Sequence, residues 1–366
     1  LESGDSVSLL AKWLPSVNAS NDDTVIKAKR IARAMGMQDS LYRKTLAHLR
    51  SHIRIIENNL RQKDYSFDYE KQTSKALLKY RKAFMRNDAD RYDSFLSNVE
   101  KGTAKLNASN VMPYELVQPF LREGGWYDRE YGFLKEMSEK EKASLNATWS
   151  SLPDFGGEEN ALAVIDTSGS MCGSEASAPI NVAISLGLYC AEKAKGPFAG
   201  HYVSFASRPQ LISTDGVDFV DKVQRIYKTN LIDNTNIEAT FDLLLDTALK
   251  TKCSQDDLPQ NIIVISDMEF DAATSGWRST SNINSRNAET VLEGIARKWA
   301  QYGYQMPHLI FWNVDARQNN IPMLGNGPIS YVSGFSPSIF ETIMSGKTGY
   351  DLMMEKLNTE RYAVIG

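Results

Sequence analysis

The sequence has few of the residues that build disulfide frameworks or zinc sites. Its 366 residues include three cysteines, Cys172, Cys190 and Cys253, which show no CxxC spacing and cannot all pair. This usage argues against a disulfide framework and indicates a reducing compartment, so we expect a cytoplasmic protein. Histidine is also scarce, with four residues. His48 and His52 lie four residues apart, but no Glu follows His48, so the zinc-protease pattern HExxH is absent.

The sequence also lacks long apolar runs and a strong charge of one sign. No stretch approaches the length of a membrane span, and the start has no basic-then-apolar signal, so no membrane partner is expected. The net charge is −4, but residues 1–150 hold 25 Lys and Arg against 20 Asp and Glu, whereas the remainder is acidic. This imbalance suggests that the two halves of the chain have different roles. It is too small to predict DNA binding.

Common catalytic motifs are missing as well. Gly346-Lys347-Thr348 resembles part of a phosphate-binding loop, but Glu341 stands where that motif requires glycine. Ser168 and Ser170 are not in a Gly-x-Ser-x-Gly turn, and no triad partners are visible for His201 or His308. We therefore expect a protein that is not an enzyme.

Residues 1–150 show helical periodicity and no convincing strand. Apolar residues at positions 46, 49, 53, 56 and 60 recur at three- and four-residue steps, which predicts one continuous helix from Leu41 to about Gln62. Further helices are expected at 21–36, 74–86, 89–101, 113–120 and 130–149. Helices of this size predict an α-helical repeat or bundle.

Basic residues share a face on two of these helices. The first set is Arg43, Arg50, Arg54 and Arg61, and the second is Lys75, Lys79, Lys82 and Arg86. A solvated helix face is the usual explanation. The functional alternative is a track for RNA phosphates, with Arg43, Arg50, Arg54, Lys75, Lys79, Lys82 and Arg86 as the candidate RNA-binding residues. Tyrosines 42, 65, 69, 80 and 92 offer rings for base stacking, although tyrosines at helical spacing more often pack inside the protein.

The pattern changes after Ser151–Gly157, a Pro- and Gly-containing stretch that we interpret as a linker. Short apolar runs then alternate with helical segments, with strands expected at 161–165, 201–205, 209–212, 261–266, 308–314 and 328–332. Alternation of this kind predicts a doubly wound, mostly parallel sheet with helices on both faces. The expected domains are therefore residues 1–150, α-helical, and residues 151–366, α/β.

Polar side chains follow the first of these strands directly. The apolar run Ala161–Ile165 leads into Asp166, Ser168 and Ser170. In an open parallel sheet, ligands bind at the carboxyl ends of the strands. A carboxylate and two hydroxyls are hard oxygen donors, which favour Mg²⁺ or Mn²⁺. An Asp-Ser turn that merely caps the following helix is the simpler alternative.

Two further oxygen donors are candidates for the same site. Thr235 precedes the amphipathic run Glu238–Leu249, and Asp267 ends a second buried strand, Asn261–Ser266. A helix cap would not account for a second strand that also ends in Asp. The predicted metal ligands are therefore Asp166, Ser168, Ser170, Thr235 and Asp267.

This pattern of Asp-x-Ser-x-Ser, a Thr before a helix and an Asp after a strand resembles the metal-ion-dependent adhesion site of von Willebrand factor A domains. The helical part placed before it resembles the architecture of Ro autoantigen ribonucleoproteins. More closely, residues 12–117 resemble an uncharacterised Ro-like family found in plants, microbes and viruses. The stretches that carry this likeness are KWLPSVNAS (Lys12–Ser20), YRKTLAHLR (Tyr42–Arg50), SKALLKYRKAFMRND (Ser74–Asp88) and KLNASNVMPYELV (Lys105–Val117).

The resemblance implies a Ro-like binding protein, because Ro proteins bind misfolded and small structured RNAs through a helical ring. About 150 helical residues are too few to close such a ring, so no RNA contact is transferred from that family. We expect the helical part to bind structured or misfolded RNA, and an acidic group of a protein partner to complete the Mg²⁺ site. The alternatives are a protein-interaction scaffold without an RNA role and, less favoured, a metal-dependent nuclease.

Overall fold

The computed structural model describes residues 9–53, 55–120, 136–155, 160–171, 179–229, 236–267, 285–315, 323–326, 329–344, 349–360 and 362. The chain divides into two compact units, residues 1–105 and residues 106–366. Among the described helices, none has the length and apolar character needed to cross a membrane.

The first unit is helical, as its apolar periodicity predicts. Its elements are α1 (Leu10–Trp13), α2 (Asp22–Ala34), α3 (Asp39–His52), α4 (Ile56–Gln62), the 3₁₀ turn η1 (Tyr69–Lys71), α5 (Ser74–Asn87) and α6 (Ala89–Glu100). Asn21 caps α2 by accepting a hydrogen bond from the Thr24 amide at 2.9 Å. Ala28 and Ala32 of α2 then pack against Tyr42 and Leu46 of α3, all four of them buried.

The continuous helix expected over residues 41–62 is wrong, because α3 ends at His52 and α4 begins at Ile56. The Asn58 side-chain amide donates to the carbonyls of Arg50 and Ile53, at 2.7 and 2.8 Å. These bonds satisfy carbonyls at the end of α3 that a further helical turn would otherwise use. The apolar spacing continues through the break, since Ile53 before it and Ile56 after it are both core residues.

Arg50 fastens α3 to α1 and to the segment that follows it. Its Nε donates to the Ala11 carbonyl at 2.8 Å, its Nη2 to the Leu14 carbonyl at 2.6 Å, and its Nη1 to Ser16 Oγ at 2.8 Å. These three bonds use all three guanidinium nitrogens and satisfy two backbone carbonyls at and just beyond the end of α1. Arg50 is therefore a structural residue of this unit.

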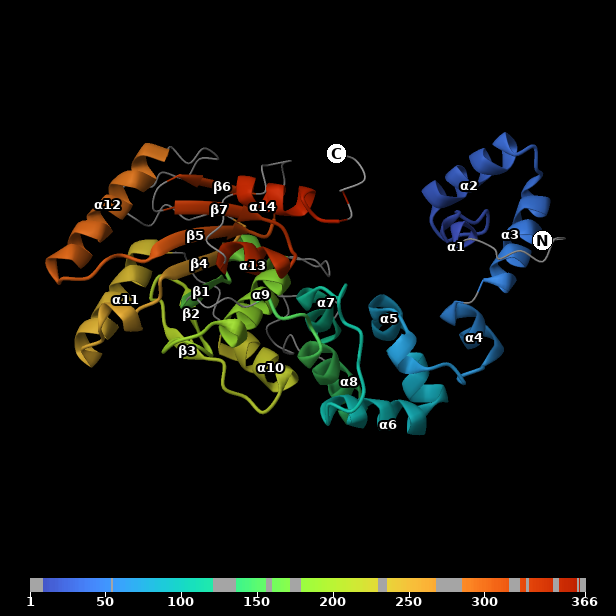
Figure 1. Ribbon diagram of the computed structural model, residues 1–366, viewed down its shortest axis with the longest axis horizontal. Helices are drawn as coiled ribbons and strands as arrows, with labels where there is room; N and C mark the ends of the chain where they lie inside the picture. The colour runs from blue at the N-terminus through green and yellow to red at the C-terminus, as the bar shows by residue number, and fades with distance from the viewer. Residues whose placement is uncertain are drawn as a thin grey trace. The chain divides into compact units, whose positions relative to one another are not determined.

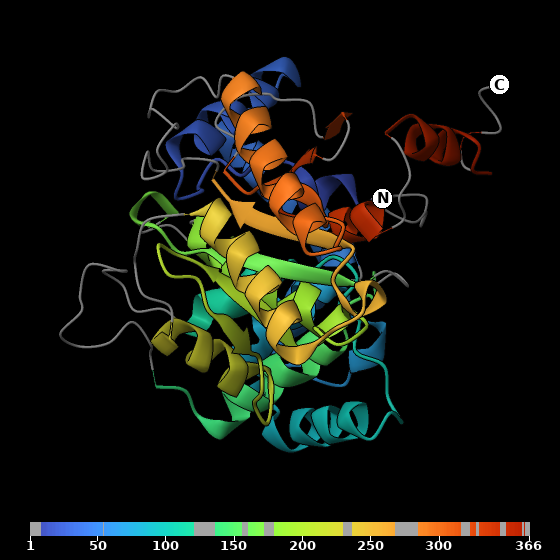
Figure 2. The same cartoon turned by 90° about the vertical axis from the view of Figure 1, so that its left-hand side faces the viewer.

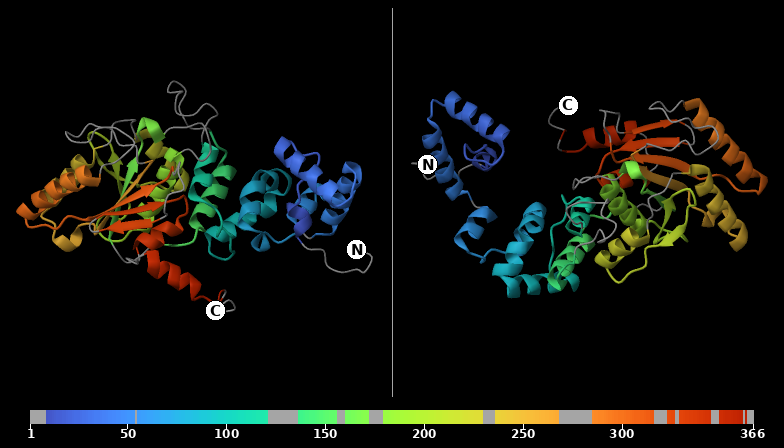
Figure 3. Two further views of the ribbon diagram at one scale, coloured as in Figure 1. Left: turned by 90° about the horizontal axis from the view of Figure 1, so that it is seen from above. Right: turned by 180° about the vertical axis from the view of Figure 1, so that it is seen from behind.

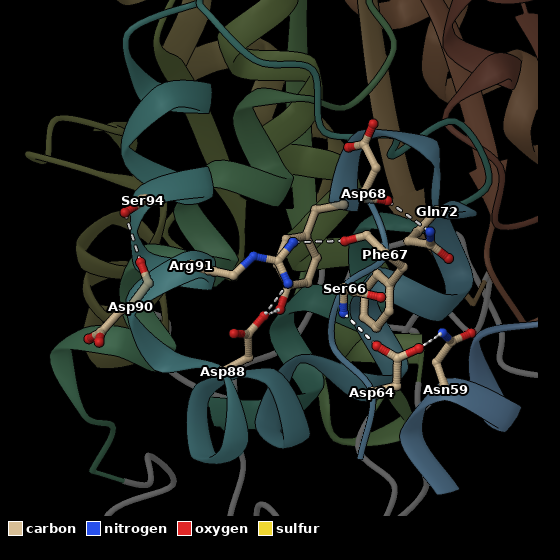
Figure 4. Close-up of polar contacts among 11 residues, drawn as sticks. Asn59, Asp64, Ser66, Phe67, Asp68, Gln72, Asp88, Asp90, Arg91 and Ser94 are labelled. Carbon is tan, nitrogen blue, oxygen red and sulfur yellow. Dashed lines mark hydrogen bonds and ion pairs between the residues drawn. The ribbon is translucent and has the colours of Figure 1, made fainter. Parts of the chain in front are cut away.

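Side-chain hydrogen bonds hold the loop after α4 to the start of α6 (Figure 4). Arg91 donates to Asp88 Oδ2 at 3.1 Å and to the Phe67 carbonyl at 2.9 Å, while Asp64 accepts from the Ser66 amide and from Asn59. Underneath lies a set of aromatic rings with centroids 5.2–6.3 Å apart: Phe67, Tyr69, Phe84, Tyr92 and Phe95. Tyr42, Tyr69 and Tyr92 are buried, so these three tyrosines pack as the helical spacing predicts.

The second unit is built on a seven-stranded sheet in the order β3-β2-β1-β4-β5-β7-β6 (Figure 1). Its strands are β1 (Ala161–Asp166), β2 (His201–Phe205), β3 (Leu211–Ser213), β4 (Asn261–Ser266), β5 (His308–Asn313), β6 (Met323–Asn326) and β7 (Ile329–Ser333). The five central strands, β2, β1, β4, β5 and β7, are parallel, whereas β3 and β6 at the edges are antiparallel. This is the doubly wound, mostly parallel α/β fold class that the sequence predicts.

Helices cover both faces of the sheet. The helices of this unit are α7 (Pro113–Val117), α8 (Glu139–Ser150), α9 (Pro179–Lys193), α10 (Phe219–Thr229), α11 (Ile237–Thr251), α12 (Ser285–Gln301), α13 (Ser338–Met344) and α14 (Gly349–Leu357), with 3₁₀ turns η2 (Gln118–Phe120), η4 (Gly169–Met171) and η5 (Gln255–Asp257). Figure 2 shows α11 and α12 in front of one face, and Figure 3 shows α9 on the other.

Side chains of β1 alternate between these two layers. Leu162 and Val164 join the core beneath α11 and α12, whereas Ile165 meets α9 at Gly187, where an added Cβ would lie 2.4 Å from the Ile165 side chain. Glycine at position 187 thus allows α9 to lie close to β1. Every residue of β1 and of β4 is buried, as their uninterrupted apolar sequences predict.

Residues 106–155 belong to the second compact unit rather than standing apart from it. In α8, Trp149 stacks on Phe219 of α10 at 4.2 Å between ring centroids, and its Nε1 donates to Glu192 of α9 at 2.7 Å. Asn146 accepts from the Val220 amide at 3.1 Å and so caps α10 from a neighbouring helix.

The stretch interpreted as a linker is held in place over its described part. Tyr189 Oη of α9 donates to the Pro153 carbonyl and accepts from the Phe155 amide, each at 2.8 Å. The sequence division at residues 150/151 and the division into compact units at 105/106 therefore differ by the segment that carries α7 and α8.

Candidate metal centre

The candidate site begins at the carboxyl end of β1, near the middle of the sheet. The parallel register pairs Ile165 with Ile265, so Asp166 ends β1 beside Ser266 at the end of β4. Asp166 is fully buried and Ser168 nearly so. Asp166 and Ser168 therefore lie at the carboxyl end of a buried parallel strand, the edge at which ligands bind in sheets of this kind.

Both carboxylate oxygens of Asp166 accept hydrogen bonds. The Ser168 amide donates to Oδ1 at 2.9 Å, and the Ser266 hydroxyl donates to Oδ2 at 2.5 Å. Burial raises the pKa of the Asp166 carboxyl to about 6, the bonds from Ser266 and Ser168 act in the lowering direction, and the charge of Asp267 raises the pKa further. Asp166 and Asp267 therefore lie near enough to repel each other when both are ionised.

The loop after β1 brings the remaining donors together. Ser168 Oγ and Ser170 Oγ lie 3.2 Å apart, with Ser170 on the 3₁₀ turn η4. The Asp267 amide donates to Sδ of the buried Met171 at 3.1 Å, which joins the end of β4 to this same turn. The structure thus gathers Asp166, Ser168, Ser170 and Asp267 in one place.

The fifth predicted ligand, Thr235, lies outside the described residues. The residue after it, Asn236, caps α11 by accepting a hydrogen bond from the Ala239 amide at 3.0 Å. α11 begins at Ile237, and the role of Thr235 as a ligand stays a prediction.

The gathered donors fit a hard divalent cation. Two ionised carboxylates that are buried near each other repel, and a doubly charged cation would supply the missing counter-charge. No group of three or more His, Cys, Asp or Glu side chains suited to an ion occurs in the part of the chain that the structure describes. A site here therefore depends on the serine hydroxyls as well as the carboxylates, a donor set that suits Mg²⁺ or Mn²⁺.

Ser266 is a functional candidate that the sequence reading missed. It is fully buried at the end of an apolar strand, and its hydroxyl orients the Asp166 carboxylate across the β1–β4 pair. The signal was the Ser-Asp pair at the end of the strand, but the strand register was needed to place Ser266 beside Asp166. Met171 was missed for a similar reason, because its contact with the Asp267 amide depends on the fold and not on a local motif.

Replacing Ser266 with alanine is expected to weaken Mg²⁺ binding by about 10–100-fold, because a residue that orients a metal ligand typically contributes that much. Isothermal titration with Mg²⁺ measures the change. Ser185→Ala is the matched control, since Ser185 is equally buried but donates to the Val182 carbonyl within α9. Equal affinities for Ser266→Ala and Ser185→Ala would contradict a positioning role.

The predicted RNA-binding residues occupy different environments in the first unit. The side chains of Arg43, Lys75, Lys79, Lys82 and Arg86 are exposed. Arg50 is held by the three hydrogen bonds described above, and Arg54 lies outside the described residues. The exposed set of four on α5 is therefore the more accessible of the two basic faces.

The segment with the oxygen cluster matches the family described as Domain of unknown function (DUF7788) over residues 160–363. The chain belongs to this family. Residues 2–154 match a second family model, Domain of unknown function (DUF2828). The two matches adjoin near the domain boundary expected at 150/151, whereas the compact units divide at 105/106, so that boundary stays a prediction.

A curated relative of the DUF7788 chain is "Uncharacterized protein L728" of Acanthamoeba polyphaga mimivirus, 28% identical over 360 residues. The match covers 93% of this chain and 58% of the viral protein, so the chain spans less than two thirds of that relative's length. Among solved structures, the Ro (RSR) protein of Deinococcus radiodurans is similar with 14% identity and a TM-score of 0.45, over 95% of this chain and 75% of that one. The manganese-loaded TRAP protein of Plasmodium vivax is similar with 15% identity and a TM-score of 0.27, over 51% and 71%.

Proposed function

We propose that this chain is a non-enzymatic, Mg²⁺-dependent binding protein of Ro-like build. The observation that carries the proposal is the gathering of Asp166, Ser168, Ser170 and Asp267 at the carboxyl ends of β1 and β4. In this proposal the strand-end site recognises an acidic group on a protein partner, and the helical unit binds structured or misfolded RNA.

The donor set supports recognition through an ion. Asp166, Ser168, Ser170 and Asp267 would hold Mg²⁺ or Mn²⁺, with Thr235 as the predicted fifth ligand. Such an ion supplies a positive centre that keeps positions open for an external carboxylate or phosphate oxygen. The serine hydroxyls are neutral, so they leave more of that positive charge for the partner than a cage of carboxylates would.

The basic face of α5 supports RNA as the second ligand. Lys75, Lys79, Lys82 and Arg86 recur at steps of four, three and four residues and are all exposed. Cations at this spacing form a row along one side of a helix, which suits successive phosphates. A cytoplasmic location is part of the proposal, because the described cysteines Cys190 and Cys253 are both free thiols.

The test is RNA binding at several salt concentrations, with a hairpin RNA that carries a single-stranded end as the probe. Charge reversal at Lys79 and Arg86 is expected to weaken binding and to reduce the slope of log K against log salt by about 0.7 per lost phosphate contact. The matched control reverses Lys27 and Arg30, which are equally exposed on α2 and change the net charge by the same amount.

The outcomes separate the proposed function from its alternatives. Absent or salt-independent binding would contradict the RNA role and leave a protein-interaction scaffold. An equal loss in the Lys27 and Arg30 control would mean that overall charge, rather than the α5 face, attracts the RNA. Cleavage of the probe that disappears in Asp267→Ala would instead support a metal-dependent nuclease.

A further inference from the structure

The last two turns of α3 carry two histidines at a spacing that can bind a metal ion. His48 and His52 are four residues apart and both exposed. Their ring centroids lie 4.6 Å apart with an interplanar angle of 72°. Residues at this spacing occupy the same helix face on successive turns, so both rings reach the same patch of solvent.

The hydrogen bonding of His52 determines which of its nitrogens is available. His52 Nδ1 lies 2.9 Å from the His48 carbonyl oxygen. A carbonyl oxygen only accepts, so Nδ1 carries the hydrogen and the neutral ring has its lone pair on Nε2. Metal-binding histidines commonly donate their other ring N–H to a backbone carbonyl in this way, which fixes the ring and its tautomer.

Ser51 contacts the same carbonyl and so reinforces this corner of the helix. Its hydroxyl donates to the His48 carbonyl at 2.7 Å and lies 3.3 Å from His52 Nδ1. The His52 ring is therefore held by a polar contact instead of rotating freely in solvent. Less conformational entropy is then lost when the ring binds an ion.

The ring separation also agrees with chelation. A Zn–N distance of about 2.0–2.1 Å places an ion roughly 3.2 Å from the centroid of each imidazole that points at it. Two centroids that are 4.6 Å apart then subtend about 90° at the ion, within the range of adjacent ligands in tetrahedral or octahedral coordination.

We propose that His48 and His52 form a two-imidazole site for a borderline divalent cation such as Zn²⁺. Imidazole nitrogens suit Zn²⁺, Cu²⁺ and Ni²⁺, whereas the oxygen donors at the strand ends suit Mg²⁺, so the two sites differ in the ions they select. No third His, Cys, Asp or Glu joins the pair among the described residues, so water completes the coordination. The bound ion cross-links the last two turns of α3, next to the break before α4.

Isothermal titration of the full chain with Zn²⁺, in buffer with excess Mg²⁺ to occupy the strand-end site, tests the proposal. The unmodified chain is expected to bind one Zn²⁺, and His48→Gln and His52→Gln are each expected to weaken this binding at least about tenfold, since each removes one of two ligands. His201→Gln is the matched control, because His201 Nδ1 lies 3.0 Å from the Ala199 carbonyl on the other compact unit.

X-ray absorption at the zinc edge gives a second measurement, in which two imidazoles per zinc are expected for the unmodified chain and one for either variant. Unchanged Zn²⁺ affinity in both His48→Gln and His52→Gln would overturn the proposal. So would loss of binding in only one of them, because a single imidazole would then account for the site. The Mg²⁺ affinity of the strand-end site is expected to be the same in all these variants.

Discussion

Replacing Trp149 with alanine is expected to lower the free energy of unfolding of the second unit by about 3–5 kcal/mol. The substitution removes the ring that stacks on Phe219 and the N–H that donates to Glu192. Trp149 is almost fully buried, so its removal leaves a cavity that neighbouring helices fill only in part. Urea unfolding followed by circular dichroism measures the change.

The control for this prediction is Trp13→Ala, because Trp13 is 76% exposed and its loss is expected to cost less than about 0.5 kcal/mol. Trp149→Phe, which keeps a stacking ring but loses the N–H, is expected to fall between the two. A small effect of Trp149→Ala would mean that α8 is dispensable for the α/β fold. Residues 106–150 would then belong functionally with the helical part.

Asp267→Ala is expected to weaken Mg²⁺ binding by at least about two orders of magnitude, because it removes one of two carboxylates that offset the charge of the ion. Without Mg²⁺ the same variant is expected to be as stable as the unmodified chain or more stable. The reason is that Asp267 raises the pKa of the buried Asp166 and so opposes its ionisation.

Thermal unfolding with and without Mg²⁺ distinguishes these two effects. The Mg²⁺-dependent rise in Tm is expected in the unmodified chain and in Asp242→Ala, a control in which the lost carboxylate pairs with Lys298 at the surface of α11. It is expected to vanish in Asp267→Ala. A full Mg²⁺ response in Asp267→Ala would remove this residue from the site.

The sequence predicts the sheet well where burial alone determines the pattern. The runs ending at Asp166 and Asp267 are apolar because both faces of β1 and β4 are covered, so their position next to polar donors was visible without coordinates. β6 was not expected, since the short stretch Met323–Asn326 contains a glycine and pairs with β7 at the edge of the described sheet. The helix break before α4 was also missed, because the bonds from Asn58 that end α3 do not alter its apolar spacing.

Some residues of the site are likewise predictable from the local sequence, whereas others depend on tertiary contacts. Asp166, Ser168 and Ser170 follow one another in the chain, so a local motif identifies them. Ser266 acts through the register of two strands, and Met171 acts through a sulfur contact with the Asp267 amide. Arg50 shows the converse, because a basic residue on a periodic helix face is used for internal hydrogen bonds. Such roles depend on partners far apart in sequence.

The most direct test of the central claim is anomalous diffraction from crystals of the full chain soaked in Mn²⁺. The account predicts one manganese peak at the carboxyl ends of β1 and β4, among the side-chain oxygens of Asp166, Ser168, Ser170 and Asp267, with Thr235 contributing from the loop before α11. Absence of a peak there, or a lysine or arginine side chain in its place, would contradict a metal-dependent binding site.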